Sequence, residues 1–168
     1  MTQTLKCQIM LKFKNMRDKK IKKKVQVVVF SMDFDLGLNS AQVLLLEFNS
    51  KNSQGPIGFQ NITGSVEENE SFIQAAKREL LEETGIDSEV LDCHFDFSFT
   101  DRWNNETECI EKLFLCIINP ERKKIQISNE HQSYKWVDVK IVREIDYTFP
   151  SNFMALNKAV ELVGAKLK

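Results

Sequence analysis

One stretch limits what this chain can fold into more than any other: residues 64–86, with the sequence GSVEENESFIQAAKRELLEETGI. Ser71 is a favoured N-cap residue, and Gly85 is a favoured residue just past the end of a helix. A helix that begins near Ser71 and ends at Gly85 is therefore expected. The apolar residues of this helix that are expected to pack against the rest of the protein are Ile73, Ala76 and Leu80.

Three carboxylates gather on one face of this expected helix. Glu79, Glu82 and Glu83 lie at spacings i, i+3 and i+4, which places them on a single turn. Crowded carboxylates repel one another, and a hard divalent cation such as Mg²⁺, the usual partner of substrate phosphates, relieves that repulsion. Arg78 is placed to pair with Glu82 or Glu70, so it is expected to orient a ligand rather than touch substrate. An acidic solvated helix face is the alternative, but it does not explain the flanking glycines or the spacing from Glu70 to Arg78.

The whole stretch resembles the signature of the Nudix hydrolases: Gly, five residues, Glu, seven residues, Arg-Glu, an aliphatic residue, any residue, Glu-Glu, any residue, Gly and an aliphatic residue. Every specified position is filled, by Gly64, Glu70, Arg78, Glu79, Leu80, Glu82, Glu83, Gly85 and Ile86. The resemblance implies an αβα sandwich and metal-dependent hydrolysis of nucleoside diphosphate derivatives. It also implies that Glu79, Glu82 and Glu83 bind Mg²⁺, with Mn²⁺ as the alternative, and that the Gly64 carbonyl supplies a further ligand.

Composition indicates one globular domain. The chain has 168 residues, of which 42% are hydrophobic and 28% charged, as in soluble proteins of ordinary size. No apolar run is long enough to span a membrane and the N-terminus lacks a signal-peptide pattern, so a cytoplasmic location is expected. The four cysteines show no C-x-x-C pairing, which argues against a zinc site and for reduced thiols.

The N-terminal region is strongly basic. Residues 1–24 carry nine lysine or arginine residues against one aspartate, although the whole chain has a net charge of −1. We interpret them as a basic arm or an extra edge strand ahead of a Nudix hydrolase domain over 25–168. A solvated surface is the simpler interpretation of such a charge run, and binding of RNA is the alternative.

The order of the expected elements predicts the fold class. The expected strands are 25–30, 43–48, 59–63, 90–100, 110–118, 125–127 and 134–139, and the second helix is capped by Ser151. Strands 90–100 and 110–118 are expected to form a long antiparallel pair. Strands, a helix, more strands and a final helix together predict an α+β domain with helices on a mixed sheet. This agrees with the Nudix-type αβα sandwich that the resemblance implies.

The resemblance continues outside the signature. Residues 59–68, 105–108, 130–136 and 151–152 are similar to bacterial dihydroneopterin triphosphate pyrophosphatases, a branch of the family, and occur in the same order. This similarity implies release of pyrophosphate from dihydroneopterin triphosphate, on the route to folate, or from a (deoxy)nucleoside triphosphate. It also implies that Glu130 is a further metal ligand or the base that activates water. A surface carboxylate in a turn is the simpler interpretation of Glu130.

Candidate contacts to the substrate ring lie in two places. Phe59 stands where that branch tends to carry Trp. Arg102, Trp103 and Asn105 lie in the exposed connection 101–107, where a cation and an aromatic ring can contact a pterin or purine. The two histidines lack a second metal-binding partner at a recognisable spacing and are assigned to no metal site.

Other activities stay open. Nudix enzymes that hydrolyse dinucleoside polyphosphates, ADP-ribose or RNA 5′ ends are alternatives, and a Nudix module that binds nucleotides without catalysis is another. The complete set of signature glutamates argues against the last of these. The expected partner is a small-molecule substrate, with no membrane association, and the chain is expected to be a monomer or homodimer.

Overall fold

The computed structural model describes residues 20–49, 58–101 and 104–166. Arg102 and Trp103, two of the expected substrate contacts, lie outside these ranges. So does the arm over residues 1–19, whose role stays a prediction.

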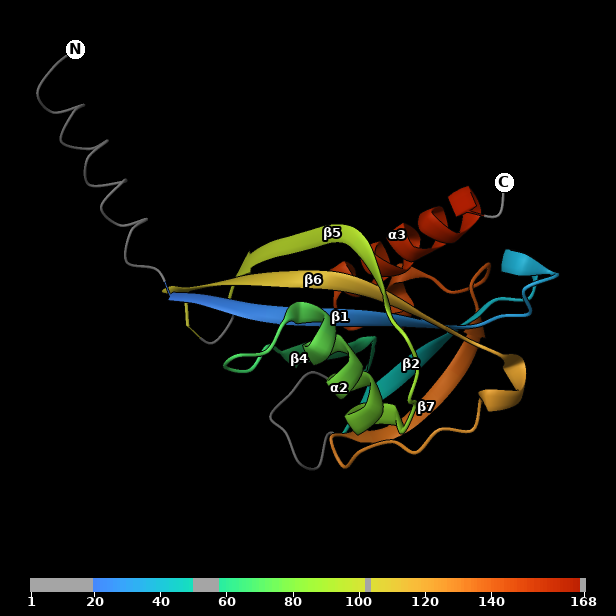
Figure 1. Ribbon diagram of the computed structural model, residues 1–168, viewed down its shortest axis with the longest axis horizontal. Coiled ribbons are helices and arrows are strands. Elements are labelled where there is room, and N and C mark those ends of the chain that lie inside the picture. Colours follow the sequence, from blue (N-terminus) through green and yellow to red (C-terminus); the bar gives the residue numbers. More distant parts are fainter. Residues whose placement is uncertain (1–19, 50–57, 102–103, 167–168) are drawn as a thin grey trace, which may run out of the picture.

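A seven-stranded mixed sheet forms the centre of the molecule, with a helix on each face (Figure 1). The strands are β1 (Lys20–Ser31), β2 (Gln42–Phe48), β3 (Phe59–Gln60), β4 (Ile62–Ser65), β5 (Leu91–Thr100), β6 (Thr107–Ile118) and β7 (His131–Asp138). The main path through the sheet is β3-β2-β1-β6-β5, while β4 also pairs with β1 and β7 with β2. β1 runs parallel to β6 and antiparallel to β2 and β4. The expected α+β fold is confirmed, and so is the long antiparallel pair, β5 with β6.

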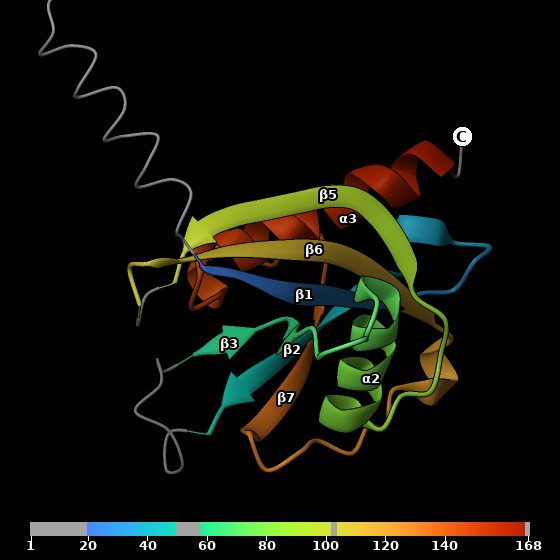
Figure 2. The ribbon, with the colours of Figure 1, turned by 60° about the vertical axis from the view of Figure 1, so that its left-hand side comes forward.

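The two long helices, α2 (Phe72–Thr84) and α3 (Pro150–Lys166), cover opposite faces of the sheet (Figure 2). The strand period explains how one strand serves both, since successive side chains point to opposite faces. In β1, Val25 and Val27 join the core cluster that contains residues of α2, whereas Val28 joins the cluster that contains residues of α3. No helix in the described part of the chain is long and apolar enough to cross a membrane.

Helix α2 begins and ends where the sequence predicts. The Ser71 side chain accepts a hydrogen bond from the Gln74 backbone N–H, and the Gln74 side chain accepts one from the Ser71 backbone N–H, which completes a capping box. Gly85 closes the helix in the left-handed conformation, with φ of 69°. Ala76 and Leu80 are fully buried as expected, but Ile73 is 44% exposed, so its assignment to the core is wrong. Ile73 shares the helix face of Ala76 and Leu80, but it lies in the first turn, so it stays exposed at the end of the helix.

Three other expectations about the elements need correction. β1 starts at Lys20, so Lys20–Lys24 form part of a strand inside the sheet and pair with β6. Residues 125–127 form no strand. Instead, the backbone N–H groups of Gln126 and of the following Ser128 donate to the carbonyls of Thr84 and Glu83, which the end of α2 leaves without helical partners. Helix α3 already includes Ser151 and begins at Pro150, a residue suited to a first helical turn.

Two adjacent leucines of α2 test the packing of this helix on the sheet. Leu80 is fully buried and Leu81 is 49% exposed. We expect Leu80→Ala to lower the free energy of unfolding by about 2–5 kcal/mol, because it removes buried methyl groups and leaves a cavity. Leu81→Ala is the matched control and should cost less than about 1 kcal/mol. Urea denaturation measures both, and equal losses would contradict this packing.

Candidate active site

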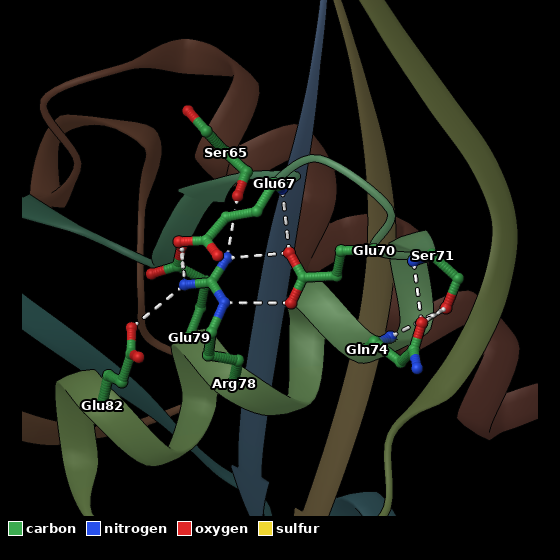
Figure 3. A network of polar contacts seen from close by, with 8 residues as sticks. All are labelled: Ser65, Glu67, Glu70, Ser71, Gln74, Arg78, Glu79 and Glu82. Carbon is green, nitrogen blue, oxygen red and sulfur yellow. Dashed lines mark hydrogen bonds and ion pairs between the residues drawn. The ribbon is translucent and has the colours of Figure 1, made fainter.

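A single guanidinium holds three acidic side chains of the signature together, those of Glu70, Glu79 and Glu82 (Figure 3). Arg78 donates to both carboxylate oxygens of Glu70, at 2.9 and 3.0 Å. Its Nη1 atom donates to Glu79 at 2.8 Å and to Glu82 at 3.0 Å, and its Nη2 atom donates to the Ser65 carbonyl at 2.9 Å. Both expected partners, Glu70 and Glu82, are therefore confirmed, and Glu79 joins them. These contacts tie the loop before α2 to the turn of the helix that carries Glu79 and Glu82.

The charges in this network shift one another's ionisation. Hydrogen bonds from Arg78 lower the pKa of Glu70, which also accepts the Glu67 backbone N–H at 2.9 Å. Hydrogen bonds to Glu70 are the main cause of the raised pKa of Arg78. Both groups are therefore charged across the physiological range, and the loop is fixed by a bidentate ion pair.

Gly64 leaves the space that the Glu79 side chain fills. A Cβ atom added at Gly64 would lie 1.9 Å from Cδ of Glu79 and 2.0 Å from its Oε1 atom. No side chain fits there without displacing the carboxylate. The signature glycine is therefore required by the position of Glu79, and not by a turn.

Burial increases along the helical turn from Glu82 to Glu79 and Glu83. Their side chains are 58%, 14% and 4% exposed, respectively. Burial raises the pKa of Glu79, although Arg78 opposes the shift. Burial raises the pKa of Glu83 well above its ordinary value, and the charges of Glu79 and Glu130 raise it further. Glu130 thus lies close enough to both buried carboxylates to act on them electrostatically.

His131 is a site residue that sequence reasoning missed. It is buried, and its Nε2 atom lies 3.5 Å from Oε2 of Glu83 and 3.4 Å from the Gln60 amide nitrogen. Its ring stacks on Phe48, and burial lowers its pKa, which favours the neutral imidazole. A lone histidine carries no spacing signal. The one sequence feature that could have identified His131 as a site residue was its position directly after Glu130, at the start of a strand.

The carboxylate oxygens of Glu83 are ligands of the type that a hard divalent cation prefers. Oε2 of Glu83 is buried and has no hydrogen-bond partner among the described residues. A buried carboxylate oxygen without a partner is costly, and a cation bound there would remove that cost. Three acidic, histidine or cysteine side chains do not converge on a preformed metal site within the described ranges. The reason is that Glu79 and Glu82 point to Arg78 while Glu83 points to His131.

The described candidates for ring contact are not well placed for stacking. Lys135 Nζ lies 3.9 Å from the centroid of the Phe59 ring, so one face of that ring is covered by a cation. Phe59 also packs partly into the core cluster on the α3 side. Asn105 is exposed in the turn between β5 and β6. A cavity of about 610 Å³ opens instead next to Gln60 and Thr63, bounded by β1, β5, β6 and the first residues of α3.

Comparison with known proteins gives the same family as the signature residues described above. Residues 22–156 match the family described as NUDIX domain. The chain is 29% identical over 162 residues to dihydroneopterin triphosphate diphosphatase of Escherichia coli strain K12, covering 86% of this chain and 97% of that protein. It is 28% identical over 147 residues to the protein of the same name from Haemophilus influenzae, covering 79% and 80%. The solved structure of the E. coli dihydroneopterin triphosphate pyrophosphohydrolase is similar with a TM-score of 0.66 and 26% identity, covering 86% of this chain and 99% of that one.

Gly64→Ala tests whether the glycine serves the carboxylate. The three atoms nearest to the added methyl group belong to the Glu79 side chain and not to the backbone, so the side chain must move while the fold should survive. We expect turnover to fall at least about tenfold, because a displaced metal ligand or catalytic group costs more than about 1.4 kcal/mol of transition-state stabilisation. Turnover and the thermal unfolding midpoint are to be measured together. Unchanged turnover would show that the contact has no bearing on catalysis.

Proposed function

The chain belongs to the Nudix family and is a hydrolase of that family, and we propose that it releases pyrophosphate from dihydroneopterin triphosphate or a (deoxy)nucleoside triphosphate. One observation carries the choice of substrate: the similarity to the E. coli enzyme extends over 97% of that protein, far beyond the signature. Dinucleoside polyphosphates, ADP-ribose and RNA 5′ ends are the alternatives that the signature alone allows.

The reaction requires charge neutralisation and an aligned water. Attack of one water on a phosphoanhydride forms one P–O bond and breaks another, giving a monophosphate and pyrophosphate. Nudix hydrolases generally use a divalent cation, usually Mg²⁺, which neutralises charge on the phosphate oxygens when bound. We assign its ligands to Glu79, Glu82, Glu83 and the Gly64 carbonyl, with Mn²⁺ as an alternative ion. The partly and fully buried members of this set lose their burial penalty on binding it.

The chain's own residues then have separate tasks. Arg78 contacts the carboxylates of Glu79 and Glu82, so it orients the ligands. Glu130 acts on Glu79 and Glu83 from the start of β7. We assign to Glu130 the role of a further ligand or of the base that takes the proton from the attacking water. His131 and the Thr63 backbone N–H position Glu83.

A panel of substrates tests this proposal. Wild-type protein should release pyrophosphate from dihydroneopterin triphosphate or from dGTP or dATP when Mg²⁺ is present, and EDTA should abolish the activity. Glu83→Gln should lower kcat at least about a hundredfold, because it removes a group that supplies several kcal/mol of transition-state stabilisation. The fold should survive this change, since a buried charge is replaced by a neutral amide of the same shape.

Controls separate the family from the substrate. Glu89→Gln removes a carboxylate whose side chain is 83% exposed and paired only with Lys77 on the surface, and it should keep wild-type turnover. Cleavage confined to ADP-ribose or dinucleoside tetraphosphates would refute the substrate and leave the family assignment intact. Wild-type turnover in Glu83→Gln would refute the catalytic role of the cluster.

Glu130→Gln tests the residue outside the signature. We expect kcat to fall much more than KM rises, because a group that activates water acts in the transition state. The negative charge of Glu130 raises the pKa of Glu79 and Glu83, so its removal lowers both. Carboxylates bind a cation only when ionised, and the acidic limb of the pH profile should therefore move to lower pH. The apparent pKa of this limb belongs to the interacting carboxylates together and not to a single residue. If kcat and the acidic limb of the pH profile both stayed unchanged, Glu130 would be a turn residue without a role in catalysis.

A further inference from the structure

The 610 Å³ cavity is joined to the acidic cluster by one short strand. Thr63 in β4 lines the cavity, and its backbone N–H donates to the Glu83 carboxylate. Gln60 also lines it, and its amide contacts His131, the neighbour of Glu83. A flat ring in the cavity therefore sits directly across β4 from the carboxylates. The cavity and the acidic cluster therefore border the same strand.

The walls of the cavity suit a heterocycle. Three aromatic side chains line it: Phe97 and Phe99 from β5, and Phe149 just before α3. Aromatic rings bind a flat heterocycle by offset stacking or edge contacts. A cavity of this size is ample for one nucleoside-sized group. Apolar walls need a few well-placed polar groups to choose between rings, and one of the polar residues that line this cavity is suited to that task.

That polar group is Glu111 of β6. It is only 4% exposed, lines the cavity, and lies 3.8 Å from Lys24 Nζ, farther than a hydrogen bond. Burial raises the pKa of Glu111 to about 7, and Lys24 opposes this only in part. A buried carboxyl with so distant a partner weakens the fold. Such a residue at the wall of a cavity is a candidate for ligand binding, because a ligand that donates hydrogen bonds removes the cost.

We infer that Glu111 selects the ring of the substrate by accepting two hydrogen bonds from the aminopyrimidinone edge that pterins and guanine share. That edge presents a ring N–H and an amino group side by side, which matches the two oxygens of a carboxylate. Adenine presents a ring-nitrogen acceptor beside its amino group, and this acceptor faces a carboxylate oxygen unfavourably. The inference rests on the proposed function and narrows it to pterin and guanine triphosphates.

The test compares three triphosphates in four proteins. kcat and KM are measured for dihydroneopterin triphosphate, dGTP and dATP with wild type, Glu111→Gln, Glu111→Asp and the surface control Glu89→Gln. The Gln amide offers one donor and one acceptor, so it mismatches the pterin and guanine edge and matches adenine. We expect Glu111→Gln to lower kcat/KM for the first two substrates by about 10- to 100-fold, mainly through KM, with dATP unchanged or improved.

Glu111→Asp keeps both acceptor oxygens and should keep the order of preference of the wild type. Glu111→Gln should unfold at a temperature no lower than wild type, because it removes a buried charge. Its activity on dATP shows directly that the variant is folded.

The outcomes separate the two proposals. A loss for pterin and guanine substrates with dATP preserved supports the role of Glu111, and the larger of the two losses identifies the natural ring. Parallel losses on all three substrates, or a wild-type preference for dATP over both others, would overturn the inference while the proposed function stands. A wild type inactive on every triphosphate would overturn the proposed function and this inference with it.

Discussion

The acidic cluster depends on the guanidinium of Arg78. Carboxylates on one helical turn repel each other, and two of the three here are also withdrawn from water. Arg78 contacts Glu79 and Glu82 within the helix and grips Glu70 through two further hydrogen bonds. The loop before α2 is thereby closed onto the helix. Without this cation the buried carboxylate of Glu79 would lack a compensating charge, a loss that typically costs several kcal/mol.

Burial gives the three signature glutamates different properties, although their chemistry is the same. Glu82 is mostly in water, whereas Glu79 and Glu83 are held against the sheet by the packing of α2. Their raised pKa values follow from that position and from mutual repulsion, with Glu130 contributing to both. A bound cation reverses each of these shifts. Burial and mutual repulsion therefore both disfavour the ionised forms of Glu79 and Glu83, and a divalent cation bound to them would relieve both effects.

Local rules predicted most of this architecture, and long-range contacts account for what they missed. Helix α2 could be placed from Ser71 and Gly85 because caps are local, and the antiparallel pair of β5 and β6 could be placed from its apolar runs. Residues 125–127 look like a strand, yet the Gln126 N–H satisfies a carbonyl at the end of α2, which no local pattern reveals. His131 became a site residue only because β7 places it beside Glu83. Glu111 shows the same limit, since only the folded sheet reveals that this strand residue is a buried carboxyl at a cavity.

The two faces of the sheet carry different parts of the candidate site: the acidic cluster lies on the α2 side and the cavity on the α3 side. Neighbouring residues in a strand face opposite sides of the sheet, and Thr63 and Gly64 are such neighbours in β4. Gly64 faces α2 and makes room for Glu79, while Thr63 lines the cavity on the α3 side. The Thr63 backbone N–H still reaches Glu83, so the strand that borders the 610 Å³ cavity also holds a carboxylate of the acidic cluster. A shift of β4 by one residue would exchange the two faces, and would put a side chain where Glu79 must lie. The register of this one short strand therefore fixes both the space that Glu79 occupies and the lining of the cavity by Thr63.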